Sequence, residues 1–255
     1  MELILSQWWN SASILSEFIS ALFLTIGVAF IKFYFEKMGQ TKKSIRYFLV
    51  PTLYGIVGTI AIYIGFGFGQ IVESGNETSL MSLPFTLIKA IYFNTYNLVI
   101  VAVIFQIIGS FVGIGIYLLI AKLSLPLMNK NAKIYDGLII NENTSKEFGA
   151  KEWVAQLLFV IILLFTSSTD FGFSIKGNIY FGIFISSLFL IIEFMIFRKV
   201  FFFMLSPQLV LVNLIAGYKY GITTKKAWLT LGYQFIIQIT ALSLVSYPEY
   251  TMRIL

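Results

Sequence analysis

Six long apolar runs constrain this chain more than any other feature of its sequence, because each is long enough to cross a lipid bilayer. They lie near 14–35, 47–69, 97–122, 152–169, 178–197 and 227–246. A spanning helix needs about 20 mostly apolar residues to cross a hydrocarbon core roughly 30 Å thick. The runs therefore predict an all-α membrane protein with six transmembrane helices.

The low charge content indicates that lipid, rather than water, surrounds much of the chain. Of its 255 residues, 58% are hydrophobic and 12% are charged, whereas about a quarter are charged in a typical soluble domain. The net charge of +6 comes from basic residues in the connections between the runs, where they can attract anionic headgroups. We expect a multi-pass protein of the cell membrane, with the lipid bilayer as a partner and without nucleic acid.

The residue types that are missing exclude most enzyme chemistry. The chain has no cysteine and no histidine, which excludes disulfides, thiolate nucleophiles, the common zinc sites and histidine general bases. The sequence also contains no phosphate-binding G-x-x-x-x-G-K motif. We therefore expect no enzyme, no catalytic residue, no metal and no cofactor.

Two short apolar segments interrupt the pattern of runs. One, 84–93, begins at Pro84 after the second run, and the other, 207–217, begins at Pro207 after the fifth. Each is too short to cross the membrane, and unpaired backbone groups cannot face lipid. Short helices that start at proline favour a pair of re-entrant half-helices. An amphipathic helix on the membrane surface is the alternative for each segment.

The chain divides into two similar halves within one membrane domain, 1–255. The first repeat is 1–122, the connecting loop is 123–151, and the second repeat is 152–255. The two halves start alike, with SEFISALFLTIG in the first and AQLLFVIILLFT in the second. An internal inverted repeat, with three spans and a half-helix in each unit, predicts two related units around a central path.

Five stretches, taken in chain order, carry a family resemblance. They are SEFISALFLTIG with Glu17, IYIGFGFG followed by MSLPFTL, FQIIGSFVGIGIYLLI with Gln106, AQLLFVIILLFTSSTDFG with Gln156, and LSPQLVLVNLIAG. In this order they resemble the aquaporin and glycerol-facilitator family, the major intrinsic proteins. The resemblance implies a homotetramer with one pore per subunit for a small neutral solute such as water or glycerol. It also implies that Glu17 and Gln156 brace the re-entrant loops through hydrogen bonds.

The pore motifs depart from the family pattern, which is Asn-Pro-Ala at the start of each half-helix. The first copy reads Ser82-Leu83-Pro84-Phe85, and the second reads Ser206-Pro207-Gln208-Leu209. The register of the first copy stays open, because anchoring on the proline selects Leu83 for the asparagine position and anchoring on Thr86 selects Ser82. Leu209 stands where the family has its filter arginine. A pore with so few donors is expected to conduct weakly or not at all.

Two further residues are candidates for a filter. Tyr54 lies in TLYGIVG, which resembles the aromatic side of the family's filter; ordinary packing between helices is the alternative. Glu193 lies within an apolar run, and an ionisable group at membrane depth is costly and marks function by default. Pairing or snorkelling near the end of a helix is the alternative for Glu193.

Charge and resemblance disagree about orientation. The family places both termini in the cytoplasm. Fifteen of the 18 basic residues cluster around the first, third and fifth connections, and the positive-inside rule therefore places both termini outside.

Two other functions stay open beside a channel. A non-conducting membrane subunit could bind a protein partner through Phe201, Phe202 and Phe203 or through 123–151, and it would copurify with that partner. A substrate-binding subunit of a vitamin or metal importer would bind its ligand tightly without passive flux.

Overall fold

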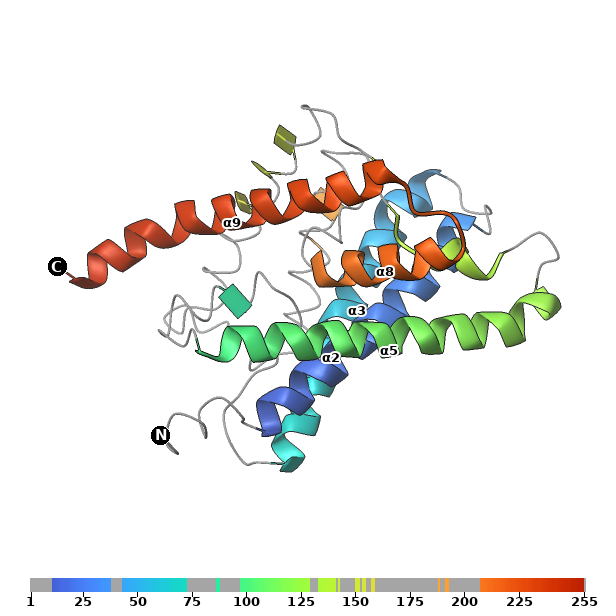
Figure 1. The fold of residues 1–255 in the computed structure, drawn as a ribbon, viewed down its shortest axis with the longest axis horizontal. Coiled ribbons are helices and arrows are strands. Elements are labelled where there is room, and N and C mark those ends of the chain that lie inside the picture. Colours follow the sequence, from blue (N-terminus) through green and yellow to red (C-terminus); the bar gives the residue numbers. More distant parts are fainter. Residues whose placement is uncertain are drawn as a thin grey trace.

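The computed structural model describes residues 11–37, 43–72, 86–87, 97–128, 133–140, 142, 150–151, 153–154, 157–158, 188, 191–192 and 207–254. In chain order the main elements are α2 (Ser11–Ile31), the π-helix η1 (Lys32–Lys37), α3 (Lys43–Val72), α5 (Asn97–Met128), the 3₁₀ helix η2 (Ile134–Gly137), α8 (Pro207–Lys219) and α9 (Lys225–Ile254) (Figure 1). The regular structure in the described residues is therefore helical, as the apolar runs predict.

Three stretches of helix are long and apolar enough to cross a membrane. They are Ser11–Tyr34, Phe48–Val72 and Val99–Ser124, with 24, 25 and 26 residues. At 1.5 Å per residue each reaches about 36–39 Å, which exceeds the hydrocarbon thickness of a bilayer. They coincide with the first three predicted runs, and α9 covers the sixth. The fourth and fifth runs lie almost wholly outside the described residues, so the number of six spans stays a prediction.

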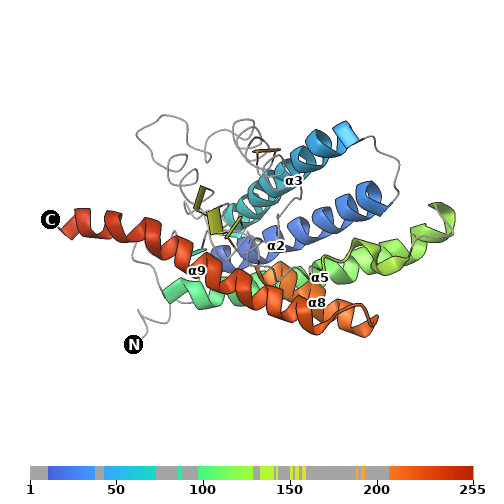
Figure 2. The ribbon, with the colours of Figure 1, turned by 90° about the horizontal axis from the view of Figure 1, so that it is seen from above.

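The helix α2 lies between α3 and α5 and packs closely against both (Figure 2). Glycines permit the close approach: a Cβ at Gly109 of α5 would overlap the carbonyl oxygen of Phe18 in α2, and a Cβ at Gly113 would lie 2.8 Å from the carbonyl oxygen of Leu22. Small residues favour association in lipid, where packing rather than the hydrophobic effect holds helices together. Gly109 and Gly113 therefore serve close packing between α2 and α5.

The helix α8 is a separate short helix that begins at Pro207. Its 13 residues span about 20 Å at 1.5 Å per residue, too little to cross a bilayer. It lies between α5 and α9 (Figure 1), and a turn at Gly221, where φ is +67°, reverses the chain into α9. The short second segment is therefore present as a helix, while its re-entrant position in a membrane stays a prediction. Only 86–87 of the first segment are described, and both are helical.

The connection between the halves differs from the predicted loop. Residues 123–128 continue α5, because hydropathy marks where a helix leaves lipid and not where it ends. Residues 133–140 then pack back onto the helices: the buried Tyr117 hydroxyl donates to the carbonyl of Ile134 at 3.1 Å and accepts from the N–H of Gly137 at 3.0 Å. The Lys32 ammonium donates to the carbonyl of Leu138. We call residues 133–142 the connector.

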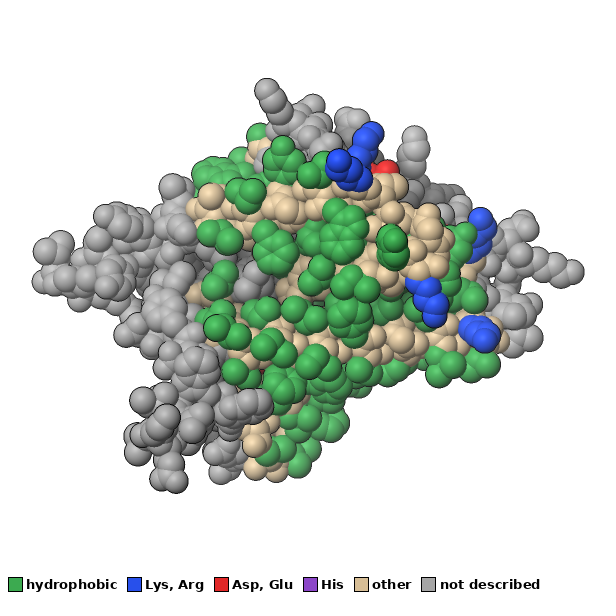
Figure 3. Space-filling model, in the orientation of Figure 1, with side chains coloured by type: hydrophobic (Ala, Val, Ile, Leu, Met, Phe, Trp, Pro, Cys, Tyr) green, Lys and Arg blue, Asp and Glu red, His purple; other side chains and the backbone are tan. Residues whose placement is uncertain are grey.

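Positive charge gathers at the end of the molecule where the connector lies. Figure 3 shows lysines at the end where α5 finishes and α8 turns into α9, and mainly hydrophobic side chains over the rest of this face. Lys133 precedes η2, Lys219 ends α8, and Lys225 begins α9. A hydrogen bond with Tyr135 raises the pKa of the Lys133 ammonium above its ordinary value. The described lysines thus follow the clustering that the sequence indicates.

We expect Gly109→Ala to destabilise the protein, because its methyl group would collide with the backbone of Phe18. Overpacking of this kind costs about 1–3 kcal/mol. Gly115→Ala is the matched control on the same helix, since nothing lies within 4 Å of its Cβ position. The measurement is the thermal unfolding midpoint in detergent. Equal midpoints for the two variants would show that the α2–α5 contact at Gly109 is not tight.

Candidate functional site

The most concentrated buried polar chemistry in the described residues centres on Gln106. Its Nε2 donates to Glu17 Oε2 at 2.8 Å and to Thr86 Oγ1 at 3.0 Å, and its Oε1 accepts from Gln208 Nε2 at 3.3 Å. All four side chains are at most 3% exposed. One carboxamide therefore joins α2, α5, α8 and the helical residues 86–87. We call these four side chains the Gln106 network.

The network brings together the starts of the two short segments. Thr86 is the second residue after Pro84, and Gln208 directly follows Pro207. Both bond the same glutamine although they come from different halves of the chain. The other residues of the two pore motifs, Ser82, Leu83, Pro84, Phe85 and Ser206, lie outside the described residues.

Glu17 lies inside the helix bundle within the first membrane-capable helix. A carboxyl group there is costly unless polar partners replace the water that it loses. The Gln106 amide supplies one such hydrogen bond, and the donor is a side chain from α5. The bracing of a re-entrant loop by Glu17 stays a prediction, and Gln156, its counterpart in the second half, lies outside the described residues.

The first turn of α8 is buried throughout. Pro207 is buried, and Gln208, Leu209 and Val210 are at most 3% exposed, so the positive end of this helix lies in the interior. Leu209 offers neither a donor nor a charge from its side chain. The interior at this point therefore combines a weak positive potential from the backbone with an apolar side chain.

Asn213, one turn further along α8, was not singled out from the sequence. Its Nδ2 donates to the carbonyl of Leu209 at 2.7 Å, and its Oδ1 accepts from the N–H of Ile139 at 2.9 Å. At the same end, Thr224 Oγ1 donates to Glu142 Oε1 at 2.8 Å. Asn213 and Thr224 thus tie the α8–α9 pair to the connector. An asparagine inside an apolar segment was the only sequence signal for this role.

The buried face of α9 carries polar side chains that the sequence analysis also missed. Thr230, Gln234 and Gln238 follow one another at intervals of four residues and are at most 1% exposed. Thr230 donates to the carbonyl of Lys226 at 2.9 Å. Neither carboxamide of Gln234 or Gln238 has a hydrogen-bond partner in the part of the chain that the structure describes. The spacing of four within an apolar run was the available signal.

The candidate filter residues are only partly placed. Tyr54 is 4% exposed on α3, in keeping with either packing or a filter. Glu193 lies outside the described residues, so the two are not placed relative to one another. Among the residues that the structure describes, no three acidic side chains come together to form a metal site.

Comparison with known proteins gives no family for this chain: no protein-family model matches it, and no curated protein sequence matches it. The resemblance to major intrinsic proteins rests on the motifs of the chain itself.

We expect Glu17→Gln to keep most of the stability, because an amide oxygen can still accept the Gln106 hydrogen bond. Glu17→Leu removes that acceptor and leaves a buried donor poorly satisfied, at a cost of about 1–3 kcal/mol. Thermal unfolding midpoints in detergent compare the two variants. If the two midpoints coincide, Glu17 does not hold the network together.

Proposed function

We propose that this chain is an aquaporin-like membrane channel for small neutral solutes, with water and glycerol as candidates, and that it conducts weakly. The observation that supports it is the Gln106 network, in which one buried amide bonds the starts of both short segments. In a channel built on paired half-helices, the two segments must meet inside the bundle. A shared hydrogen-bonding side chain is a direct way to hold them there.

The proposal includes the architecture that such a channel requires. It has six spanning helices, two re-entrant half-helices in an inverted repeat, and four subunits with one pore in each. Three membrane-capable helices, a short α8 and a long α9 are compatible with that arrangement. The protein would work in the cell membrane as a multi-pass channel.

Weak conduction follows from the chemistry at the start of α8. A solute that enters a narrow pore loses water, and each hydrogen bond left unreplaced costs about 1–3 kcal/mol. Leu209 is 1% exposed, and its side chain replaces none of the hydrogen bonds that the solute loses. An apolar constriction can also stop flow by dewetting. Several missing donors together should slow flux by orders of magnitude.

Orientation is the second part of the proposal. The connector and the α8–α9 turn carry the lysines described above, and basic connections face the cytoplasm in most membrane proteins. We place this end in the cytoplasm, which inverts the fold relative to the family. The α8 helix then runs from the interior toward the cytoplasm.

We expect a cysteine at the basic end to be inaccessible from outside an intact cell. The native chain has no cysteine, so Lys226→Cys supplies a single reactive thiol at an exposed position. A membrane-impermeant maleimide should label it only after permeabilisation. A cysteine added ahead of Met1 is the control and should react before permeabilisation. The opposite labelling pattern would establish the family's usual orientation.

We expect slow osmotic water and glycerol flux in vesicles that contain the unmodified protein. Leu209→Arg combined with Ser206→Asn should raise this flux, because the pair restores a charge and an amide at the second motif. Leu209→Met is the control, since it conserves volume without adding a donor. Stopped-flow light scattering measures the rate. Fast flux through the unmodified protein would contradict weak conduction. If neither the unmodified protein nor the double variant conducts, the non-conducting subunit is favoured.

A further inference from the structure

Gln234 and Gln238 are buried amides that no described residue bonds. Each leaves both its Oε1 and its Nε2 unbonded among the residues that the structure describes, and the two do not bond one another. Buried carboxamides in folded proteins are nearly always satisfied, because an unbonded polar group loses its interaction with water and gains nothing. Two successive exceptions on one helix face, unbonded by any described residue, therefore mark groups that are free to bind a small molecule.

The buried amide of Gln106, unlike those of Gln234 and Gln238, has hydrogen-bond partners. Gln106 is as fully buried as Gln234, yet both ends of its amide are engaged. Thr230, on the same face of α9, bonds its own helix. Gln106 and Thr230 thus form hydrogen bonds within the described residues, whereas the amides of Gln234 and Gln238 form none there.

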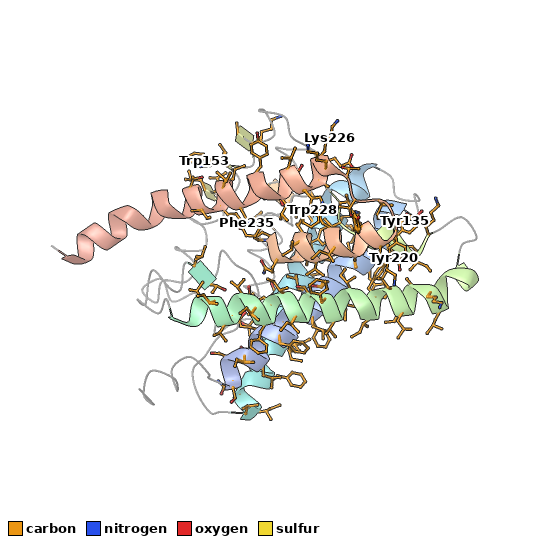
Figure 4. All side chains as sticks on the ribbon, viewed as in Figure 1. Tyr135, Trp153, Tyr220, Lys226, Trp228 and Phe235 are labelled. Carbon is orange, nitrogen blue, oxygen red and sulfur yellow. The ribbon has the colours of Figure 1, made fainter. Side chains whose placement is uncertain are left out.

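The register of α8 against α9 places the two amides at the depth of the network. Val210 and Leu214 of α8 pack with Ala227 and Leu231 of α9 in one cluster. The two helices run in opposite directions. Gln208, which precedes Val210 on α8, therefore lies level with Gln234, which follows Leu231 on α9. Gln238 lies about one turn further along α9. Figure 4 shows Phe235, the neighbour of Gln234, between α9 and the start of α8.

We propose that Gln234 and Gln238 form the solute-binding pair, and that they select a small neutral molecule with a hydrogen-bond donor beside an acceptor. The inference rests on the proposed channel function and names the residues that choose its solute. Each carboxamide presents a C=O and an NH₂ group, and residues four apart are separated by about 6 Å along a helix. A molecule of a few heavy atoms fits that spacing.

The chemistry of the pair favours neutral molecules over ions. Carboxamides carry no formal charge, and an ion that left water here would gain only dipoles in return. An acceptor without a donor satisfies only the NH₂ groups and leaves each glutamine carbonyl unbonded. The pair should therefore discriminate between molecules of equal shape that differ only in a donor.

Acetamide and acetone provide this test, because they share a shape and only acetamide carries N–H donors. Saturation-transfer NMR on the full chain in detergent should show stronger transfer to acetamide than to acetone. Gln234→Leu with Gln238→Leu should reduce the acetamide signal to the acetone level. Thr240→Val is the control: Thr240 is exposed on α9, and its hydroxyl bonds carbonyls of its own helix, so the preference should persist.

The thermal midpoint of each variant accompanies the NMR measurement. The double variant should unfold at or above the midpoint of the unmodified protein, because the amides that it removes have no partner in the part of the chain that the structure describes. A lower midpoint would show that they do bond the protein and would overturn the proposal. Equal transfer to both solutes in the unmodified protein, or a preference that survives in the double variant, would also overturn it.

Acetamide flux in vesicles separates this inference from the channel function. Binding with the expected preference but without flux supports the glutamine pair and contradicts the channel. Flux that is unchanged in the double variant keeps the channel and overturns the pair as its selector. Flux that falls to the level of empty vesicles in the double variant, with Thr240→Val unchanged, supports both.

Discussion

A buried amide in a bundle that faces lipid must find its partners inside the protein, and the arrangement around Gln106 depends on this requirement. Its partner Glu17 is within reach because α2 and α5 approach closely at the next turn, where Gly109 meets the backbone of Phe18. A side chain at Gly109 would push the helices apart and lengthen the hydrogen bond one turn away. The glycine and the glutamine therefore depend on one another: Gly109 permits the short distance between α2 and α5, and Gln106 forms its hydrogen bond across that distance.

Much of the helical framework could be predicted because hydropathy depends on composition alone. The first run falls within α2 and η1, and the second, third and sixth fall within α3, α5 and α9. The start of α8 follows from Pro207, whose ring favours the first turn of a helix. The end of α5 could not be predicted in this way, since a helix continues past the membrane without an apolar signal. The burial of the connector could not be predicted either, because Leu138, Ile139 and Ile140 form a run of only three apolar residues within a polar stretch.

The sequence could identify single residues of the site but not the contacts between them. Glu17, Gln106 and Gln208 were named because they lie in the stretches that carry the family resemblance, but their shared hydrogen bonds depend on how separate helices meet. The sequence analysis did not identify Gln234 and Gln238, because averaging the hydropathy over a long apolar run hides two amides within it. A helical plot of α9 would have shown them on one face with Thr230, although it could not have shown that they lack partners.

The bond between Gln106 and Gln208 also has a consequence for the order of events during synthesis. Ribosomes deliver α2, α3 and α5 to the membrane well before α8, since chains are made from the N-terminus. Until α8 arrives, Gln106 Oε1 lacks its Gln208 donor, and the Asn213 acceptor for the connector backbone is also absent. The early helices can pack through their glycines, but the interior closes only after the second half is made. A chain that stalls before α8 thus lacks the partners that α8 supplies to the Gln106 amide and to the connector backbone.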